Sequence, residues 1–263
     1  MFNLNGKAAL VTGGAGGLGR VFCEALAGQG ADIAVADIDL EAAREAAQRI
    51  RSSAGKAVAL EADVSAPDQV GRMVSETVRA FGKIDILINN AGISAGAARI
   101  AEMRLEDWDR VMAVNLRGVF LCTRAVLPVM EKQQSGSIVN IASVKGIRPL
   151  FEVTRLNPKA HYTVAKAGVI SLTKEAAQEY AGAGIRVNCI APGWYGQTRL
   201  DRWLEPSQVD EYRKTQEAVV KRITPMGRIG NPKELQGILL YLASDASSFV
   251  TGQVFVVDGG ICI

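Results

Sequence analysis

The residues of this chain with the clearest chemical potential are a tyrosine and a lysine four positions apart, Tyr162 and Lys166. On a helix this spacing places both side chains on one face. An ammonium group held close to a phenol favours the phenolate and lowers the pKa of the tyrosine, so the pair could transfer a proton. The spacing also occurs by chance, and its significance therefore depends on the elements that would hold the pair.

A glycine-rich segment near the N-terminus predicts where a dinucleotide would bind. The apolar run at 7–12 breaks into GGAGGLG at 13–19 and continues as a helical pattern. A glycine turn between a strand and a helix lets bare backbone approach a pyrophosphate, whose negative charge the helix dipole favours. Two registers fit: one uses Gly14, Gly16 and Gly19, and the other uses Gly13, Gly17 and Gly19.

Asp37 predicts which dinucleotide the chain prefers. It closes the second apolar strand 18 residues beyond Gly19, where a carboxylate can accept hydrogen bonds from both ribose hydroxyls. A 2′-phosphate at that place would meet like charge, which favours NAD over NADP. Arg20 could offset part of this repulsion, and Asp37 could instead cap the helix that begins near Leu40.

Taken together, these features resemble the short-chain dehydrogenase/reductase family in its classical form, from about residue 7 to residue 260. The family combines a Tyr-x-x-x-Lys pair with the second glycine register. Further landmarks follow in the family's order: Asp63-Val64, Asn89-Asn90-Ala91-Gly92, Asn115, Ser143, Pro192-Gly193 and Asp258-Gly259-Gly260.

The resemblance implies a role for each catalytic candidate. Ser143 would hold the reacting oxygen, and Tyr162 would act as base in alcohol oxidation and as acid in ketone reduction. Lys166 would lower the tyrosine pKa and bind the nicotinamide ribose. Asn115 would anchor a water molecule that leads from Lys166 towards solvent. A serine at a strand end is otherwise an ordinary helix cap.

The resemblance also implies the cofactor contacts. Asp63 and Val64 would bind the adenine, and the Asn-Asn-Ala-Gly segment, which is otherwise a tight turn, would pass close to the cofactor. The family often has a threonine four residues after Gly193, but Gln197 stands there and Thr198 follows it. The expected cofactor-binding residues are Gly13, Gly17, Leu18, Gly19, Asp37, Ile38, Asp63, Val64, Asn90, Ala91, Gly92, Tyr162, Lys166, Pro192, Gly193, Tyr195 and Thr198.

Apolar runs alternate with helical patterns along the whole chain. Strands that are apolar throughout predict an α/β fold with both faces of a parallel sheet covered. We expect a single doubly wound Rossmann-type domain over residues 1–263, with about seven parallel strands. The expected strands are 8–11, 33–36, 57–60, 84–88, 137–141, 186–190 and 254–257. The expected helices are 18–29, 40–52, 69–81, 105–130, 160–180, 207–222 and 232–242.

Composition argues against several classes of partner. The net charge of +3, from 30 basic and 27 acidic residues, is too small and too evenly spread to indicate nucleic acid or an anionic membrane surface. No basic-then-apolar leader and no run of about 18 apolar residues occurs. The four cysteines lack disulfide or metal spacing. We expect a cytoplasmic protein that needs no metal.

The segments around the substrate indicate its class. Ser143 and Tyr162 are 19 residues apart, more than is usual in the family, so extra residues enter a rim formed by 144–161 and 194–226. A basic, aromatic rim suggests a polyol, sugar or sugar acid, although the same residues could face solvent. His161, the single histidine, would face away from Tyr162, which argues against a hydrolytic triad. The rim residues are Arg148, Arg155, Lys159, His161, Arg199, Arg202, Trp194 and Tyr195.

Three functions remain open at this point. The first is an NAD-dependent dehydrogenase of a secondary alcohol, with a small alcohol or ketone as substrate. The second is an NADPH-dependent reductase of a 3-oxoacyl thioester, and the third is a non-catalytic dinucleotide-binding regulator. The resemblance and the apolar surplus in helices 105–130 and 160–180 and in segment 249–263 further predict a homotetramer.

Overall fold

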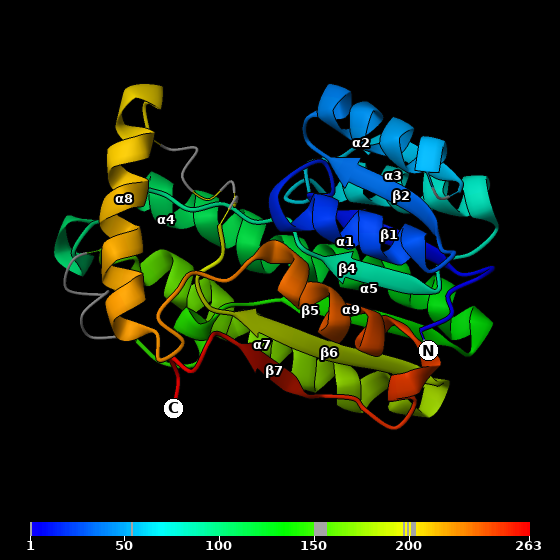
Figure 1. Cartoon of the computed structure of the whole chain (residues 1–263). Helices are drawn as coiled ribbons and strands as arrows, with labels where there is room; N and C mark the ends of the chain where they lie inside the picture. Colours follow the sequence, from blue (N-terminus) through cyan, green and yellow to red (C-terminus); the bar gives the residue numbers. More distant parts are fainter. Residues whose placement is uncertain (1, 54, 150–156, 197, 199, 201–203) are drawn as a thin grey trace.

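The computed structural model describes residues 2–53, 55–149, 157–196, 198, 200 and 204–263. Its centre is one sheet of seven parallel strands in the order β3-β2-β1-β4-β5-β6-β7 (Figure 1). The predicted α/β fold is therefore confirmed. The strands are β1 Ala8–Thr12, β2 Asp32–Asp37, β3 Ala57–Glu61, β4 Ile86–Asn89, β5 Gly136–Ile141, β6 Ile185–Pro192 and β7 Val254–Val257.

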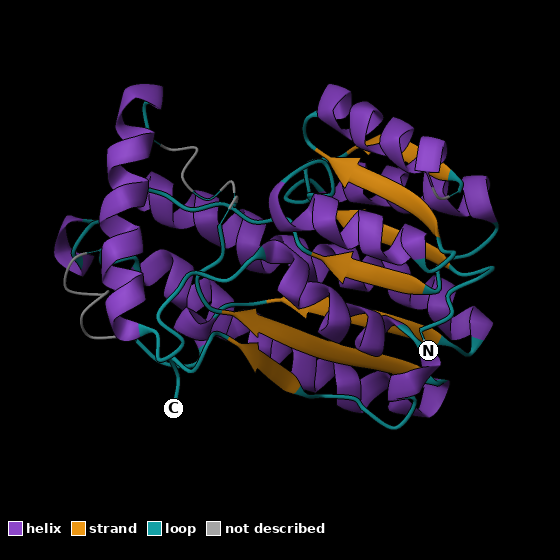
Figure 2. Ribbon diagram, in the orientation of Figure 1, coloured by secondary structure: helices purple, strands orange, loops and turns teal. Residues whose placement is uncertain are grey.

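Helices cover both faces of the sheet, as Figure 2 shows. One core cluster joins α1, α2 and α9 to the sheet, and another joins α3, α5 and α7 to the opposite face. The helices are α1 Gly17–Gly28, α2 Leu40–Ser53, α3 Pro67–Phe81, α4 Leu105–Met112, α5 Gly118–Gln133, α7 Ala160–Tyr180, α8 Pro206–Ile223 and α9 Gln236–Ala243.

Strands β1 to β6 are mainly apolar because each contributes to both clusters. In β1, Ala9 and Val11 belong to the cluster with α1, whereas Leu10 between them belongs to the cluster with α3. Alternate side chains of a strand point to opposite faces, so a strand covered on both sides needs no polar alternation. All five residues of β1 are buried.

The helix predicted at 105–130 is interrupted, which is a correction to the sequence-based expectation. Between α4 and α5 lies a π-helical turn, Ala113–Arg117, that contains Asn115. Gly118 begins α5, and a Cβ there would lie 2.8 Å from Val64 Cγ2. Single π turns often occur at functional sites. The last predicted helix also divides, into a 3₁₀ turn Pro232–Leu235 and α9.

The combined stretch Leu105–Gln133 is long and apolar enough to cross a membrane by length and composition alone. Half of its most apolar window is buried inside the protein. Leu121, Val126 and Met130 contribute to the core against the sheet. A core helix of a folded domain passes the same test, so this stretch carries no argument for a membrane span.

The carboxyl ends of the strands point towards α8 and α4 (Figure 1). β1, β4, β5 and β6 are neighbours in the sheet, so the residues that follow them come together at this edge. In open parallel sheets, ligands bind at this edge because the loops there converge around the point where the strand order reverses.

Candidate active site

The glycine turn after β1 has the geometry of a phosphate site. Gly13 has φ of 61° and Gly17 has φ of 54°, both in the left-handed region. A Cβ on Gly19 would lie 2.0 Å from the Gly13 carbonyl oxygen, and one on Gly13 would lie 2.9 Å from Ala91 Cα. These constraints favour the second register, Gly13, Gly17 and Gly19. No side chain caps the N-terminus of α1 and no acidic residue lies in its first turn, which suits an anion.

A groove of about 330 Å³ runs from this turn across the ends of the strands. It brings together nearly all of the predicted cofactor residues. Gly19 is the exception, because it lies buried beneath the turn rather than on the groove. The predicted residues on the groove are Gly13, Gly17, Leu18, Asp37, Ile38, Asp63, Val64, Asn90, Ala91, Gly92, Tyr162, Lys166, Pro192, Gly193, Tyr195 and Thr198.

Asp37 is buried at the end of β2 and faces this groove. Its carboxylate accepts hydrogen bonds from the backbone N–H of Ala15, at 3.1 Å, and of Asp39, at 3.2 Å. The cap of α2 is Asp39, whose side chain accepts from Ala42 N at 3.1 Å. The alternative role of Asp37 as helix cap is therefore wrong. Asp37 instead ties the glycine turn to the end of β2.

Ser143, Tyr162 and Lys166 meet at the end of β5. Ser143 precedes a 3₁₀ turn, Val144–Gly146, and its Oγ accepts from Lys145 N at 3.2 Å. Tyr162 and Lys166 lie on one face of α7, with Lys166 Nζ 5.7 Å from the centre of the tyrosine ring. Lys166 Nζ donates to the carbonyl oxygen of Ile141 at 2.7 Å. The sequence spacing thus predicted the shared face correctly.

Burial opposes the charged forms of both side chains. It raises the pKa of Tyr162 to about 12, although the hydrogen bond with Ser143 acts in the opposite direction. Burial also lowers the pKa of Lys166 to about 8. Burial therefore dominates the pKa of Tyr162 in this structure, and the expected lowering of that pKa by Lys166 stays a prediction.

Asn115 is fully buried in the π-helical turn. Its Oδ1 accepts from Ile93 N and its Nδ2 donates to Ile93 O, both at 2.8 Å. A Cβ on Gly92 would lie 3.5 Å from Asn115 Oδ1 and 3.6 Å from Lys166 Nζ, so the three residues converge. Asn115 holds the segment after β4 against the site. Its role with a water molecule stays a prediction.

Comparison with known proteins agrees with this geometry. A family model described as enoyl-(acyl carrier protein) reductase matches residues 13–262. The chain is 41% identical over 261 residues to 3-oxoacyl-(acyl-carrier-protein) reductase of Thermotoga maritima, covering 99% of each chain. It is 38% identical over 255 residues to cyclohexanol dehydrogenase of an Acinetobacter species, covering 97% of this chain and 94% of the relative. A solved short-chain type dehydrogenase/reductase from Mycobacterium marinum is similar with a TM-score of 0.91 at 37% identity, covering 99% and 97% of the two chains. The chain belongs to the short-chain dehydrogenase/reductase family.

As a short-chain dehydrogenase/reductase, the protein is an oxidoreductase of CH–OH groups and binds a nicotinamide dinucleotide. The residues of the groove fit that cofactor independently of these comparisons. Its glycine turn leaves no room for a Cβ at Gly13 or Gly19, and the first turn of α1 has no side-chain cap. Asp37 stands at the ribose end of this groove by its place in the fold.

A second pocket of about 280 Å³ adjoins the groove at Ser143 and Tyr162. Of the predicted rim residues, Lys159, Trp194 and Tyr195 line it. Arg155, Arg199 and Arg202 lie outside the described residues. Among those that the sequence analysis did not name, Lys145, Asn157, Tyr212 and Arg213 line this pocket.

Two rim predictions are wrong. Arg148 does not line the pocket, and its guanidinium donates to Ile261 O at 3.3 Å. His161 is buried away from the pocket, and burial lowers the pKa of its imidazole. Helical periodicity along α7 correctly predicts that His161 and Tyr162 point to different faces. The orientation of the Arg148 side chain depends on its contact with the C-terminal segment, which local sequence cannot predict. The only sequence signal that could have assigned Lys145 to this pocket is its position two residues after Ser143.

Proposed function

We propose that the protein is an NAD(H)-dependent oxidoreductase that interconverts a secondary alcohol and a ketone. One observation carries the proposal: Ser143 and Tyr162 line both the dinucleotide groove and the second pocket. A substrate in the second pocket would therefore place its carbinol carbon beside the cofactor and its oxygen beside a hydroxyl and a phenol. Proximity of this kind supplies much of the rate enhancement of a two-reactant step.

The bound dinucleotide supplies a hydride acceptor in oxidation and a hydride donor in reduction. Ser143 Oγ orients the substrate oxygen, and Tyr162 Oη removes its proton in oxidation or returns one in reduction. Reduction suits the buried phenol directly, because its raised pKa keeps it protonated. Oxidation needs the phenolate, which the nearby ammonium of Lys166 would stabilise in the assembled site.

Asp37 supports NAD as the preferred dinucleotide. Its carboxylate is fixed by Ala15 and Asp39 on the groove, so it cannot swing away from a 2′-phosphate without losing two hydrogen bonds. Arg20 Nε lies 3.9 Å from Glu24 Oε1, and the two side chains form an exposed ion pair. The guanidinium of Arg20 is therefore already paired with the carboxylate of Glu24. Like charge near Asp37 therefore opposes NADP.

A specific observation favours the second candidate, an NADPH-dependent 3-oxoacyl thioester reductase. Arg20 and Arg49 line a hollow beside the glycine turn that also includes Gly16 and Gly17. Guanidinium groups there could bind a phosphate. The Thermotoga maritima relative is named as a 3-oxoacyl reductase. Turnover of a secondary alcohol with either dinucleotide would exclude the third candidate, a non-catalytic regulator.

Cofactor kinetics test the choice. We expect kcat/KM with NAD to exceed that with NADP by at least about tenfold, because about 1.4 kcal/mol of repulsion gives that factor. Asp37→Ser should reduce the ratio of kcat/KM with NAD to kcat/KM with NADP. Asp39→Ser, which keeps a residue able to cap the helix, should leave this ratio unchanged. Equal or better turnover of the unmodified enzyme with NADP would favour the reductase.

We further propose that the protein assembles as a homotetramer. The surface between α4, α5 and α7 carries a shallow apolar hollow whose lining includes Met112, Leu116, Phe120 and Leu172. Nearly half of the Phe120 side chain is exposed, as is almost all of Ile263 at the C-terminus. Exposed apolar surface of this kind is often covered by another subunit.

A further inference from the structure

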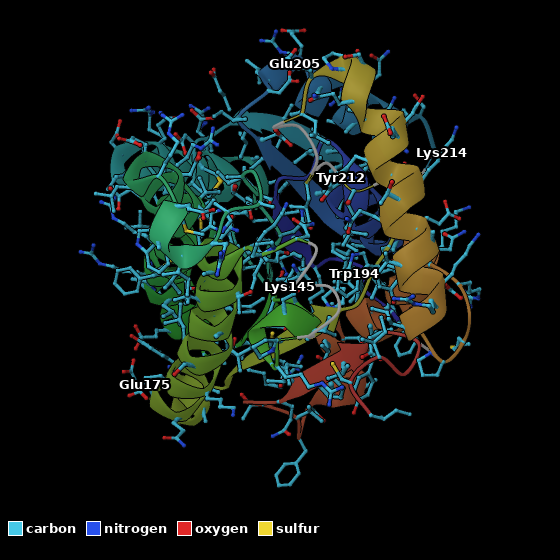
Figure 3. The ribbon with its side chains drawn as sticks, turned by 90° about the vertical axis from the view of Figure 1, so that its left-hand side faces the viewer. Lys145, Glu175, Trp194, Glu205, Tyr212 and Lys214 are labelled. Atoms are coloured by element: carbon cyan, nitrogen blue, oxygen red, sulfur yellow. The ribbon has the colours of Figure 1, made fainter. Side chains whose placement is uncertain are left out.

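The second pocket contains an unusual arrangement of charge. It lies between the 3₁₀ turn after Ser143, the start of α7, the segment after β6, and α8. Figure 3 shows Lys145 and Trp194 next to each other beside α8, with Tyr212 above them. Lys145 Nζ lies 6.0 Å from the centre of the Trp194 ring. The indole face therefore meets the cation within the range of a cation–π contact.

Lys145 is a half-buried cation at the catalytic end of this pocket. Among the described residues, no carboxylate lies within ion-pair distance of its ammonium and no hydrogen bond is formed by Nζ. Burial lowers the pKa of Lys145 to about 8, so the group remains mainly protonated at neutral pH at an energetic cost. A cation that is partly removed from water and has no counter-charge can gain one from a bound ligand.

A second ammonium faces the same space. Lys159 lines the pocket and is buried, and its Nζ donates to Ser94 Oγ at 2.9 Å, which orients it. Glu217 is the single acidic side chain among the described lining residues, and its carboxylate pairs with Lys221 Nζ at 2.8 Å. Among the described lining residues, no acidic side chain is therefore left to balance the charge of Lys145.

We infer that the substrate carries a carboxylate, and that Lys145 binds it while Ser143 and Tyr162 hold the hydroxyl. The inference rests on the proposed function and names its substrate class, a small hydroxy acid and its oxo acid. The carbon skeleton between the two polar groups packs against Trp194. A neutral 3-oxoacyl thioester would leave the half-buried Lys145 without a counter-charge, which disfavours that substrate.

Matched pairs of substrates test the inference, with the intact enzyme and NAD. The pairs are 4-hydroxycyclohexanecarboxylate with its methyl ester and 3-hydroxybutyrate with its methyl ester. We expect the unmodified enzyme to prefer at least one acid over its ester by about tenfold or more in kcat/KM. Lys145→Met should reduce that preference at least about tenfold, mainly through KM for the acid, and Lys145→Arg should retain most of it.

Lys214 provides the matched control, because it is exposed on the outer side of α8 and lines neither pocket (Figure 3). Lys214→Met removes the same charge from the same surface region and should leave the preference unchanged. Equal losses in Lys145→Met and Lys214→Met would indicate a general field effect and would overturn a specific role for Lys145. A preference of the unmodified enzyme for both esters would overturn the inference as well.

A binding measurement separates this inference from the proposed function. Cyclohexanecarboxylate has no hydroxyl to oxidise, and its binding to the enzyme with NADH can be followed by calorimetry. Binding that weakens at least about tenfold in Lys145→Met supports the carboxylate site even if no alcohol is turned over. Turnover of neutral alcohols together with no binding of the carboxylate supports the proposed function and overturns the inference.

Discussion

At the scale of single residues, the site places groups that can ionise where water is largely excluded. Tyr162 and Lys166 are both buried, and burial shifts the pKa of each towards its neutral form. Ser143 and the carbonyl of Ile141 provide the polar contacts that remain. A site of this kind lowers the stability of the folded protein, because its buried charged groups become favourable only when the reactants are bound.

Replacing Tyr162 with phenylalanine should remove the proton carrier and keep the ring. We expect Tyr162→Phe to lower kcat at least about a hundredfold, the size typical of an acid-base residue, while the dissociation constant for NAD changes little. Steady-state kinetics and fluorescence titration measure the two quantities. Tyr180→Phe, at the far end of α7, is the control and should keep normal turnover. More than about a tenth of kcat in Tyr162→Phe would contradict the assignment.

Lys166→Met should stabilise the cofactor-free protein at pH 7. Burial lowers the pKa of Lys166 from 10.5 to about 8, so the unfolded chain binds more protons between these two values. Stability then rises with pH across that window, and below it the buried ammonium costs roughly 3 kcal/mol. Methionine leaves the Ile141 carbonyl without this hydrogen bond, which offsets about 1–2 kcal/mol of the gain.

Denaturant unfolding of the two proteins without cofactor measures this difference. We expect a gain of about 1–2 kcal/mol for Lys166→Met at pH 7 that disappears near pH 10.5, where lysine is neutral in the unfolded chain too. A variant that is less stable than the parent at pH 7 and equal at high pH would show that the ammonium is stabilising in place.

At the scale of elements, the proposed catalytic residues depend on close contact between the 3₁₀ turn Val144–Gly146 and α7. A Cβ on Gly146 would lie 2.6 Å from the Lys166 backbone carbon and 2.7 Å from Ala167 N. Both neighbours are backbone atoms of a helix, which cannot yield as a flexible side chain does. The glycine thus sets the separation between Ser143 and Tyr162.

Gly146→Ala should therefore push the turn away from α7. We expect a loss of about 1–3 kcal/mol in the free energy of unfolding, as in other overpacked sites, and a fall in kcat with unchanged protonation behaviour. Gly71→Ala, in the interior of α3 with nothing within 4 Å of the new Cβ, should instead stabilise by about 0.5–1 kcal/mol. Similar stability of the two variants would contradict the proposed contact.

At the scale of the whole molecule, apolar surface remains after the two core clusters are complete. The exposed face of α4 and α5 includes Phe120, and the hollow beside it includes Leu116 and Leu172. This face also explains why Leu105–Gln133 resembles a membrane span by composition, because its apolar residues cover both a core face and an outer face.

A charge on this face should disrupt the assembly. We expect the unmodified protein to be a tetramer at micromolar concentration by light scattering, and Phe120→Asp to shift it to smaller species because an interface would bury an unpaired carboxylate. Ile100→Asp, at an exposed position in the 3₁₀ turn Ile100–Glu102, should keep the tetramer. A stable monomer of the unmodified protein would refute the proposal.

The sequence by itself determined the fold class, the strand positions and the pairing of Tyr162 with Lys166. These follow from local rules, namely apolar runs, glycine turns and helical spacing, which act between residues close together in the chain. Their places after strands located Asp37 and Ser143 at one edge of the sheet, because the carboxyl ends of neighbouring parallel strands must meet, and the family resemblance added Asn115.

Only the tertiary structure decided the properties that depend on distant neighbours. The π-helical turn at Asn115 arises where α4 and α5 pack against the segment after β4, and local periodicity carries no sign of it. Arg148 faces Ile261 whereas Lys145 faces Trp194, although both belong to one basic segment. Spacing along a helix predicted a lowered tyrosine pKa, but the burial that raises it comes from many segments at once, because desolvation depends on everything packed around the phenol.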